Sequence, residues 1–151
     1  MALVDALRNH GFTHGLTPEQ MASLAAIADE VTFDESELVL MEGQRSTAFY
    51  LLTSGSVAVE LRASCFVVCV QALGPGQVFG WSSLLDHQDT LFQVRAREHT
   101  TALRLDGGAL KSLCRTDTPL GTEILQRTLQ IVAGRVKATE LRFAEMCGVR
   151  L

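Results

Sequence analysis

The chain has 151 residues, of which 47% are hydrophobic and 20% are charged, so it is long enough to bury one core and is neither disordered nor collagen-like. Its apolar runs are far shorter than the ~20 residues that span a bilayer, and residues 1–8 lack the features of a signal peptide. Thirteen basic and seventeen acidic residues give a net charge of −4 without a dense basic face, which argues against direct binding of nucleic acid by this chain.

The spacing and context of the four cysteines bear on whether the protein resides in a reducing or an oxidising compartment. They stand in apolar segments, without a Cys-x-x-Cys pair or a secretory context, at Cys65, Cys69, Cys114 and Cys147. We therefore predict that they are small buried side chains of a reduced, cytoplasmic protein.

Two short helices are predicted at the N-terminus. The first covers residues 3–9. The second begins at Thr17, where Pro18 suits the first helical position and Gln20 completes a capping-box pattern. Its apolar stripe ends near Asp29.

Strand patterns follow between Val31 and Asp106, separated by glycine turns such as Gly74-Pro75-Gly76. The predicted strands include residues 37–41, 48–53, 56–61, 65–73, 77–80, 92–97 and 100–105. Residues 65–73 are apolar on both faces of the strand, so we expect both faces to be covered. No long helices separate the strands, which favours a double-stranded β-helix (jelly roll) of about eight strands over a parallel sheet.

A long helix is predicted from Pro119 to about Cys147, after a short one at residues 109–114. One of its faces is an apolar seam with 4-3-4-3-4-3 spacing, made of Leu125, Leu129, Val132, Val136, Thr139, Phe143 and Met146. Three heptads of this kind predict a parallel two-helix homodimer interface, with Thr139 as its one polar member. The alternative is that the stripe packs on the parent roll. Gly134 is expected to permit a close contact.

The order of these elements resembles the cyclic nucleotide-binding domain, and most closely the sensor half of bacterial CRP/FNR-type regulators. The resemblance is carried by residues 49–57 (Phe-Tyr-Leu-Leu-Thr-Ser-Gly-Ser-Val), by residues 73–80 (Leu-Gly-Pro-Gly-Gln-Val-Phe-Gly) and by Val94-Arg95-Ala96. It implies a mainly β fold with flanking helices and a short phosphate-binding helix inside the roll. The helix N-terminus and an arginine would hold the cyclic phosphate, and a glutamate after the Phe-Gly pair would hold the ribose.

The chain departs from this pattern at both anchors. Trp81 stands at the glutamate position and Thr90 at the arginine position, and residues 80–93 contain no Lys or Arg but do contain Asp86 and Asp89. The loss of two charge-assisted contacts, at ~1.5–3 kcal/mol each, predicts that cAMP and cGMP bind about two to four orders of magnitude more weakly.

A candidate ligand pocket nevertheless remains. Its residues are Phe79, Gly80, Trp81, Ser82, Ser83, Leu84, Thr90, Leu91 and Thr139. Ser82 and Ser83 are expected to cap the short helix and to offer hydroxyls, while Trp81 either stacks on a flat ring or fills the space of the missing nucleotide. Thr139 lies where the resemblance places a helix residue against the base, or it is a polar seam position that sets register. Arg45, in the loop after Gly43, is expected to be a solvated loop residue; the alternative is that it reaches an anion of the ligand.

The sequence shows no arrangement of residues that is typical of an enzyme active site. The four histidines form no ligand pair on a strand, His10 and His14 are expected to be a surface pair, and no nucleophile–base arrangement is visible. No catalytic residue and no metal site are predicted.

We therefore expect a non-catalytic, cytoplasmic regulatory domain over residues 1–151, with a helical N-terminus (1–29), a β-roll (30–106) and C-terminal helices (109–147). It would bind a cyclic nucleotide or another small ligand, or no ligand at all. The alternative is a structural protein–protein interaction domain with a filled pocket. A protein partner is compatible with either reading, as is an origin as part of a longer transcription regulator.

Overall fold

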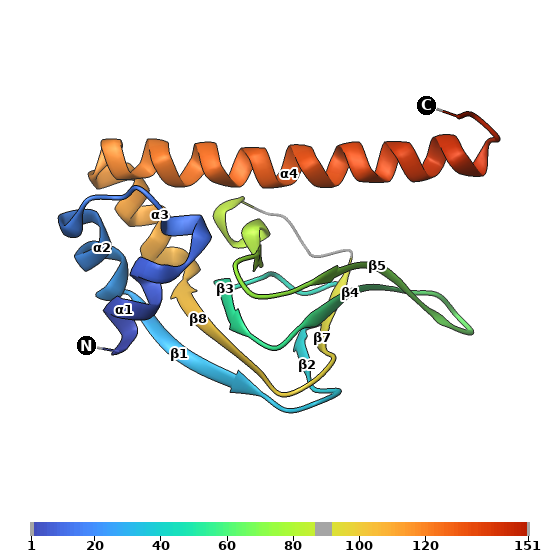
Figure 1. The fold of residues 1–151 in the computed structure, drawn as a ribbon, viewed down its shortest axis with the longest axis horizontal. Helices are drawn as coiled ribbons and strands as arrows, with labels where there is room; N and C mark the ends of the chain where they lie inside the picture. The colour runs from blue at the N-terminus through green and yellow to red at the C-terminus, as the bar shows by residue number, and fades with distance from the viewer. Residues whose placement is uncertain (1, 87–91, 151) are drawn as a thin grey trace. The chain divides into compact units, whose positions relative to one another are not determined.

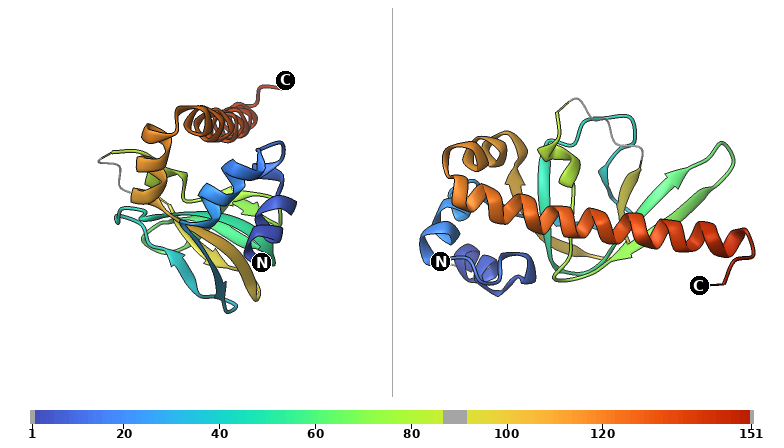
Figure 2. Two further views of the ribbon diagram at one scale, coloured as in Figure 1. Left: turned by 90° about the vertical axis from the view of Figure 1, so that its left-hand side faces the viewer. Right: turned by 90° about the horizontal axis from the view of Figure 1, so that it is seen from above.

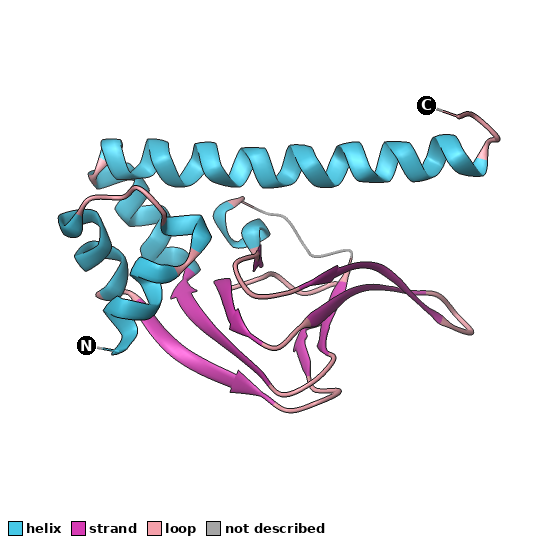
Figure 3. Cartoon of the chain, in the orientation of Figure 1, coloured by secondary structure: helices cyan, strands magenta, loops and turns pink. Residues whose placement is uncertain are grey.

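The computed structural model describes residues 2–86 and 92–150. The chain divides into two compact units, Met1–Ser112 and Leu113–Leu151. The first unit holds the N-terminal helices and all of the described strands, and the second consists of helix (Figure 3).

The first unit opens with α1 (Ala2–Asn9), the 3-10 turn η1 (Gly11–Thr13) and α2 (Pro18–Ala25). The capping box is confirmed: the Thr17 hydroxyl accepts from the Gln20 backbone N–H at 3.1 Å, and the Gln20 side chain accepts from the Thr17 N–H at 2.9 Å. The expected end of this helix near Asp29 is wrong, because residues 28–33 already pair as a strand with the end of the roll.

Two antiparallel four-stranded sheets form the roll (Figure 1). One sheet has the order β1-β8-β3-β6 and the other has the order β2-β7-β4-β5. The strands are β1 (Ala28–Phe33), β2 (Leu38–Leu40), β3 (Ala48–Ser54), β4 (Val57–Arg62), β5 (Val67–Leu73), β6 (Val78–Phe79), β7 (Gln93–Ala96) and β8 (Thr100–Asp106). The expected fold class, a β-roll with flanking helices, is confirmed.

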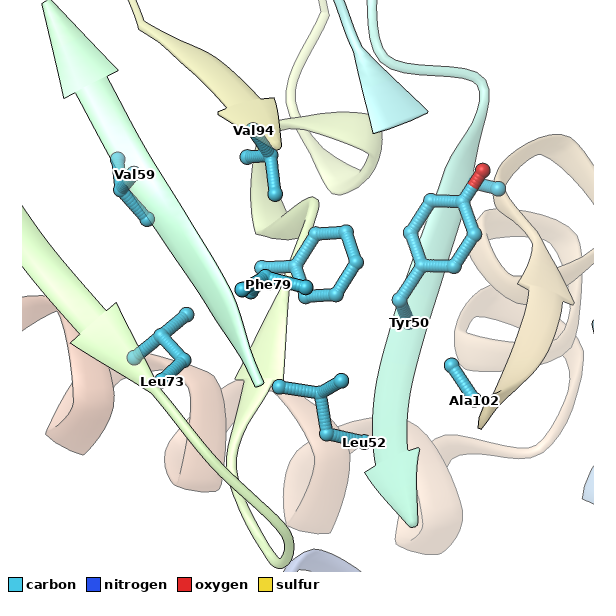
Figure 4. Packing of buried hydrophobic residues seen from close by; sticks show 9 residues of the cluster. Tyr50, Leu52, Val59, Leu73, Phe79, Val94 and Ala102 are labelled. Atoms are coloured by element: carbon cyan, nitrogen blue, oxygen red, sulfur yellow. The ribbon is translucent and has the colours of Figure 1, made fainter. Parts of the chain in front are cut away.

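The core of the roll lies between the inner faces of the two sheets (Figure 4). Strand β3 is buried on both faces, because Tyr50 and Leu52 point into the roll while Phe49 contacts Phe12 beside the N-terminal helices, with ring centroids 5.2 Å apart. A strand that is covered on both sides reads as an apolar run, and this explains the sequence of residues 48–52.

His10 is buried, so its expected place in a surface pair is wrong. Its Nε2 donates to the Leu52 carbonyl at 2.8 Å, and its Nδ1 accepts from the Phe12 N–H at 3.1 Å. A carbonyl only accepts and an amide N–H only donates, so the two contacts select one neutral tautomer. Burial lowers the pKa of His10, which agrees with a neutral ring.

The expectation that both faces of residues 65–73 are covered is also wrong. β5 is an edge strand, and Phe66 and Val67 are 62% and 47% exposed. The predicted burial of the cysteines fails for the same reason at Cys65 and Cys69, and Cys147 is exposed beyond the last helix. Cys114 is half-buried, and all four thiols are free.

The second unit contains the long helix α4 (Thr118–Met146), and α3 (Gly107–Thr116) crosses the boundary between the units. Asp117 caps α4 by accepting from the Leu120 N–H at 3.3 Å, and Gly148 follows its end in the left-handed region at φ 77°. The predicted long helix and its glycine stop are confirmed. Figure 2 shows that α4 runs without a break.

Candidate functional site

The candidate segment begins at Gly80, directly after β6. Gly80 has φ 80°, and a Cβ at this position would lie 2.5 Å from the Ala48 carbonyl oxygen. Both facts require glycine. The backbone then turns into the short 3-10 helix η2 (Trp81–Leu84), closed by a bond from the Ser83 N–H to the Gly80 carbonyl at 3.0 Å. The segment is thereby held against the first residues of β3.

The serines of η2 do not cap it, and this expectation is wrong. The cap position is Gly80, which has no side chain to offer, and no side-chain bond caps the turn. Ser83 is only 6% exposed, and its Oγ has no hydrogen-bond partner among the described residues. Its Cβ lies close to Gly107, where an added Cβ would meet it at 2.9 Å. A buried hydroxyl without a partner is costly and marks a place where a ligand or water can bind.

The other predicted pocket residues divide into three groups. Phe79 is buried in the roll, whereas Trp81, Ser82 and Leu84 are half-buried. Thr90 and Leu91 lie outside the described residues. Thr139 belongs to α4 in the second unit, where its exposed hydroxyl donates to the Arg135 carbonyl at 2.9 Å. The structure therefore brings Phe79, Gly80 and Ser83 together beside β3 and leaves the remaining pocket assignments as predictions.

An ion pair at the end of the segment was not anticipated. Lys111 Nζ in α3 lies 2.7 Å from Asp86 Oδ1. The ammonium group compensates part of the negative charge of Asp86 and ties the segment to α3. The two residues are 25 positions apart, so no local pattern could reveal the pair.

Gln71 is a second residue that the sequence reasoning missed. It belongs to a row of paired residues across the inner face of one sheet, namely Leu40, Val94, Val59 and Gln71. Gln71 Oε1 is buried and has no hydrogen-bond partner among the described residues. The available signal was its position two residues before the buried Leu73, which puts both side chains on the same face of the strand.

Two antiparallel four-stranded sheets that form a roll, with a short helical segment between β6 and β7 and a long helix after the last strand, define the class of β-roll domains with flanking helices. The chain belongs to the cyclic nucleotide-binding domain family, whose model matches residues 30–117. The resemblance to CRP/FNR-type sensor domains is confirmed by the solved structures that share this fold.

Three relatives illustrate the match. The chain is 30% identical over 121 residues to the rice potassium channel AKT1 (Oryza sativa subsp. indica), covering 74% of this chain and 13% of that channel. A crystal structure from Geobacter metallireducens, titled as a candidate cyclic nucleotide-binding protein, is 26% identical with a TM-score of 0.76 and coverage of 87% and 96%. The Thermus thermophilus catabolite activator protein is 25% identical with a TM-score of 0.74 and coverage of 91% and 63%.

The chain thus spans about an eighth of the plant channel that it matches. Across residues 2–86 and 92–150, no helix combines the length and the apolar character needed to cross a membrane. The same part of the chain contains no cluster of three or more His, Cys, Asp or Glu side chains suited to hold a metal ion.

Proposed function

We propose that this chain is a non-catalytic regulatory domain in which cAMP and cGMP bind weakly because both of the expected charged anchors are replaced. The observation that supports the proposal is the fixed turn at Gly80. Trp81 follows this turn directly, where the family resemblance implies the ribose-holding glutamate. An indole has one N–H donor and no acceptor, so it cannot accept hydrogen bonds from ribose hydroxyls.

The phosphate side supports the same conclusion. Thr90 stands where the resemblance implies an arginine, and residues 80–93 contain no cation. Lys111 is a cation that the structure describes beside this segment, and it is paired with Asp86. The two lost charge-assisted contacts are together worth about two to four orders of magnitude in affinity.

Restoring both anchors tests the proposal. Isothermal titration of the wild-type chain with cAMP and with cGMP should give dissociation constants in the millimolar range or no measurable heat. The double variant Trp81→Glu/Thr90→Arg should bind at least one of them ~100-fold more tightly. The matched control Trp81→Gln/Thr90→Gln introduces uncharged polar side chains at the same two positions, and its affinity for cAMP and cGMP should not increase. Micromolar binding by the wild-type chain would overturn the proposal.

A second candidate function is a structural interaction domain with a filled pocket. It is favoured by the packed interior of the roll, where Tyr50, Phe79 and Leu52 occupy the space between the sheets. In that case no small ligand shifts the melting temperature of either the wild-type chain or the double variant, and the function lies in a protein partner.

We also propose that two copies associate through α4. Its predicted seam contains strongly exposed apolar side chains, including Leu129 at 67%, Phe143 at 68% and Met146 at 85%. Gly134 lies in the same helix, and a Cβ at this position would meet no described atom within 4 Å. Exposed apolar faces of this kind typically mark a protein–protein interface.

We further place the protein in the cytoplasm. The four free cysteines support this, because a reducing compartment keeps thiols unpaired. The net charge of −4 supports a protein partner or a small ligand over nucleic acid.

A further inference from the structure

A cavity of about 190 Å³ lies beside β2 and is lined by residues that precede the η2 segment in the chain. One wall is the apolar stretch 38–41, the other is the polar loop 44–47, and Tyr50 completes the lining. The cavity adjoins the start of η2, because a Cβ on Gly80 would lie 3.2 Å from Tyr50 Cδ2 and 3.4 Å from Ser46 Oγ.

The volume limits what can enter. Drug-sized ligands occupy pockets of roughly 300–1,000 Å³, whereas an engineered cavity of about 150 Å³ holds benzene. Scaling from benzene gives an occupant of about eight non-hydrogen atoms. A whole nucleotide, with its base, sugar and phosphate, exceeds this volume.

The charge of the lining selects among small molecules. Arg45 is the one charged residue among the described lining residues. Nearby, Arg104 binds Asp29 through bonds of 2.6 Å and 3.2 Å, so that pair is close to neutral. The Arg45 guanidinium has five N–H donors and can therefore hold a carboxylate while it keeps a contact within the chain.

Tyr50 adds a neutral donor. Burial raises the pKa of its phenol, and this effect exceeds the opposing effect of the Arg104 guanidinium. The hydroxyl therefore keeps its proton at physiological pH. In Figure 4 this hydroxyl points away from Leu52 and Ala102, which lie deeper in the roll. Together, these features describe a pocket with an apolar wall on one side and donors for an anion on the other.

We propose that this cavity binds a small monocarboxylate with a compact apolar body, such as a single aromatic ring. The apolar body lies against residues 38–41, and the carboxylate accepts from Arg45 and from the Tyr50 hydroxyl. The site adds to the proposed regulatory function and does not depend on whether a cyclic nucleotide binds. Ser46 and Tyr50 line the cavity and also lie next to Gly80. A bound molecule would therefore contact residues that pack against the turn where η2 begins.

Benzoate, with benzyl alcohol as an uncharged comparison that keeps the aromatic ring, is a suitable probe. Titration of the ¹⁵N-labelled chain followed by ¹H–¹⁵N correlation spectra should give saturable shifts concentrated in residues 38–50, with weaker binding of benzyl alcohol. No saturable shift at 10-fold excess over a millimolar dissociation constant (about 10 mM probe), or shifts concentrated elsewhere, would overturn the proposal.

Two variants separate the contributions. Arg45→Gln, at an exposed loop position, should weaken benzoate binding ~10- to 100-fold and leave benzyl alcohol unchanged. Tyr50→Phe keeps the ring packing and should weaken benzoate binding by up to ~10-fold. Arg97→Gln, which removes an exposed arginine in the β7–β8 turn, is the matched control and should have no effect. If Arg45→Gln and Arg97→Gln weaken benzoate binding equally, the effect comes from net charge alone, and the assigned site is contradicted.

The cAMP and cGMP titrations test a different segment of the chain. The two proposals can therefore fail independently of each other.

Discussion

The rings of Tyr50 and Phe79 lie parallel, with their centroids 4.7 Å apart and their planes within 8° of each other. Tyr50 belongs to the doubly buried strand β3, and Phe79 is the last residue before the Gly80 turn. The pair therefore joins the core of the roll to the start of the candidate segment, and Phe33 meets the same tyrosine edge-on at 6.1 Å.

Truncation of this contact should destabilise the roll and the segment together. Phe79→Ala removes a buried ring that stacks on Tyr50. We expect the free energy of unfolding to fall by ~3–5 kcal/mol, and the melting temperature to fall by roughly 10 °C. Thermal denaturation followed by circular dichroism measures this loss. Phe66→Ala, at a 62% exposed ring in the same unit, should change stability by less than about 0.5 kcal/mol. Similar losses in the two variants would contradict the assigned core.

Gly80 should tolerate substitution less well than Gly43, although both have φ near 80°. A Cβ at Gly43 meets nothing within 4 Å, whereas a Cβ at Gly80 meets the Ala48 carbonyl at 2.5 Å. We expect Gly43→Ala to cost about 1–2 kcal/mol from backbone strain alone, and Gly80→Ala to cost about 3 kcal/mol or more, because the clash adds to the strain. Urea denaturation of both variants tests this, and equal costs would show that the turn relaxes without penalty.

Stability should depend on pH through His10. Burial holds its pKa below the ordinary value of 6.5, so the unfolded chain binds a proton at a higher pH than the folded chain does. The contribution of this residue is therefore complete above about pH 6.5 and is lost as the pH falls toward the lowered pKa. Urea denaturation between pH 7.5 and pH 5 should show this loss. His10→Gln should flatten this part of the profile, and replacing the exposed His99 by Gln should leave it in place.

Gln71 and Gln93 allow a comparison between a buried side-chain amide that lacks a hydrogen-bond partner and one that has a partner. Gln71 Oε1 is buried without a partner, whereas Gln93 donates to Glu60 Oε1 at 2.9 Å. Gln71→Met should be neutral or stabilising by about 1 kcal/mol, and Gln93→Met should cost about 1–2 kcal/mol. Melting temperatures of the two variants decide the comparison. A large loss from Gln71→Met would mean that its amide is already satisfied in the folded chain.

Association through α4 should depend on the apolar seam. Val136 is half-exposed at the middle of the seam, and Val136→Glu puts a charge between two apolar faces, so we expect monomers by multi-angle light scattering. Gln126→Glu adds the same charge at an exposed position outside the seam and is the control. A dimer that survives Val136→Glu, or a wild-type chain that is monomeric at high concentration, would contradict the heptad interpretation.

The sequence by itself determined the features that rest on neighbouring residues. The Thr17 capping box, the glycine turns, the strand order along the chain and the long helix after Asp117 are all local patterns, and each of them is confirmed. The proposal that Trp81 and Thr90 replace the two anchors also rests on the sequence alone, because the resemblance specifies those positions by their distance from Phe79-Gly80 and from Val94.

Only the tertiary structure decided the features that depend on partners far away in the chain. His10 is buried because it bonds Leu52, 42 residues later, and Asp86 meets Lys111 across 25 residues. β5 reads as a covered strand but lies at a sheet edge, which exposes Cys65 and Cys69 and makes the buried-cysteine prediction wrong. The order of strands within a sheet, and the cavity that Arg45 and Tyr50 line, follow from pairing between distant segments, which hydrophobic periodicity does not encode.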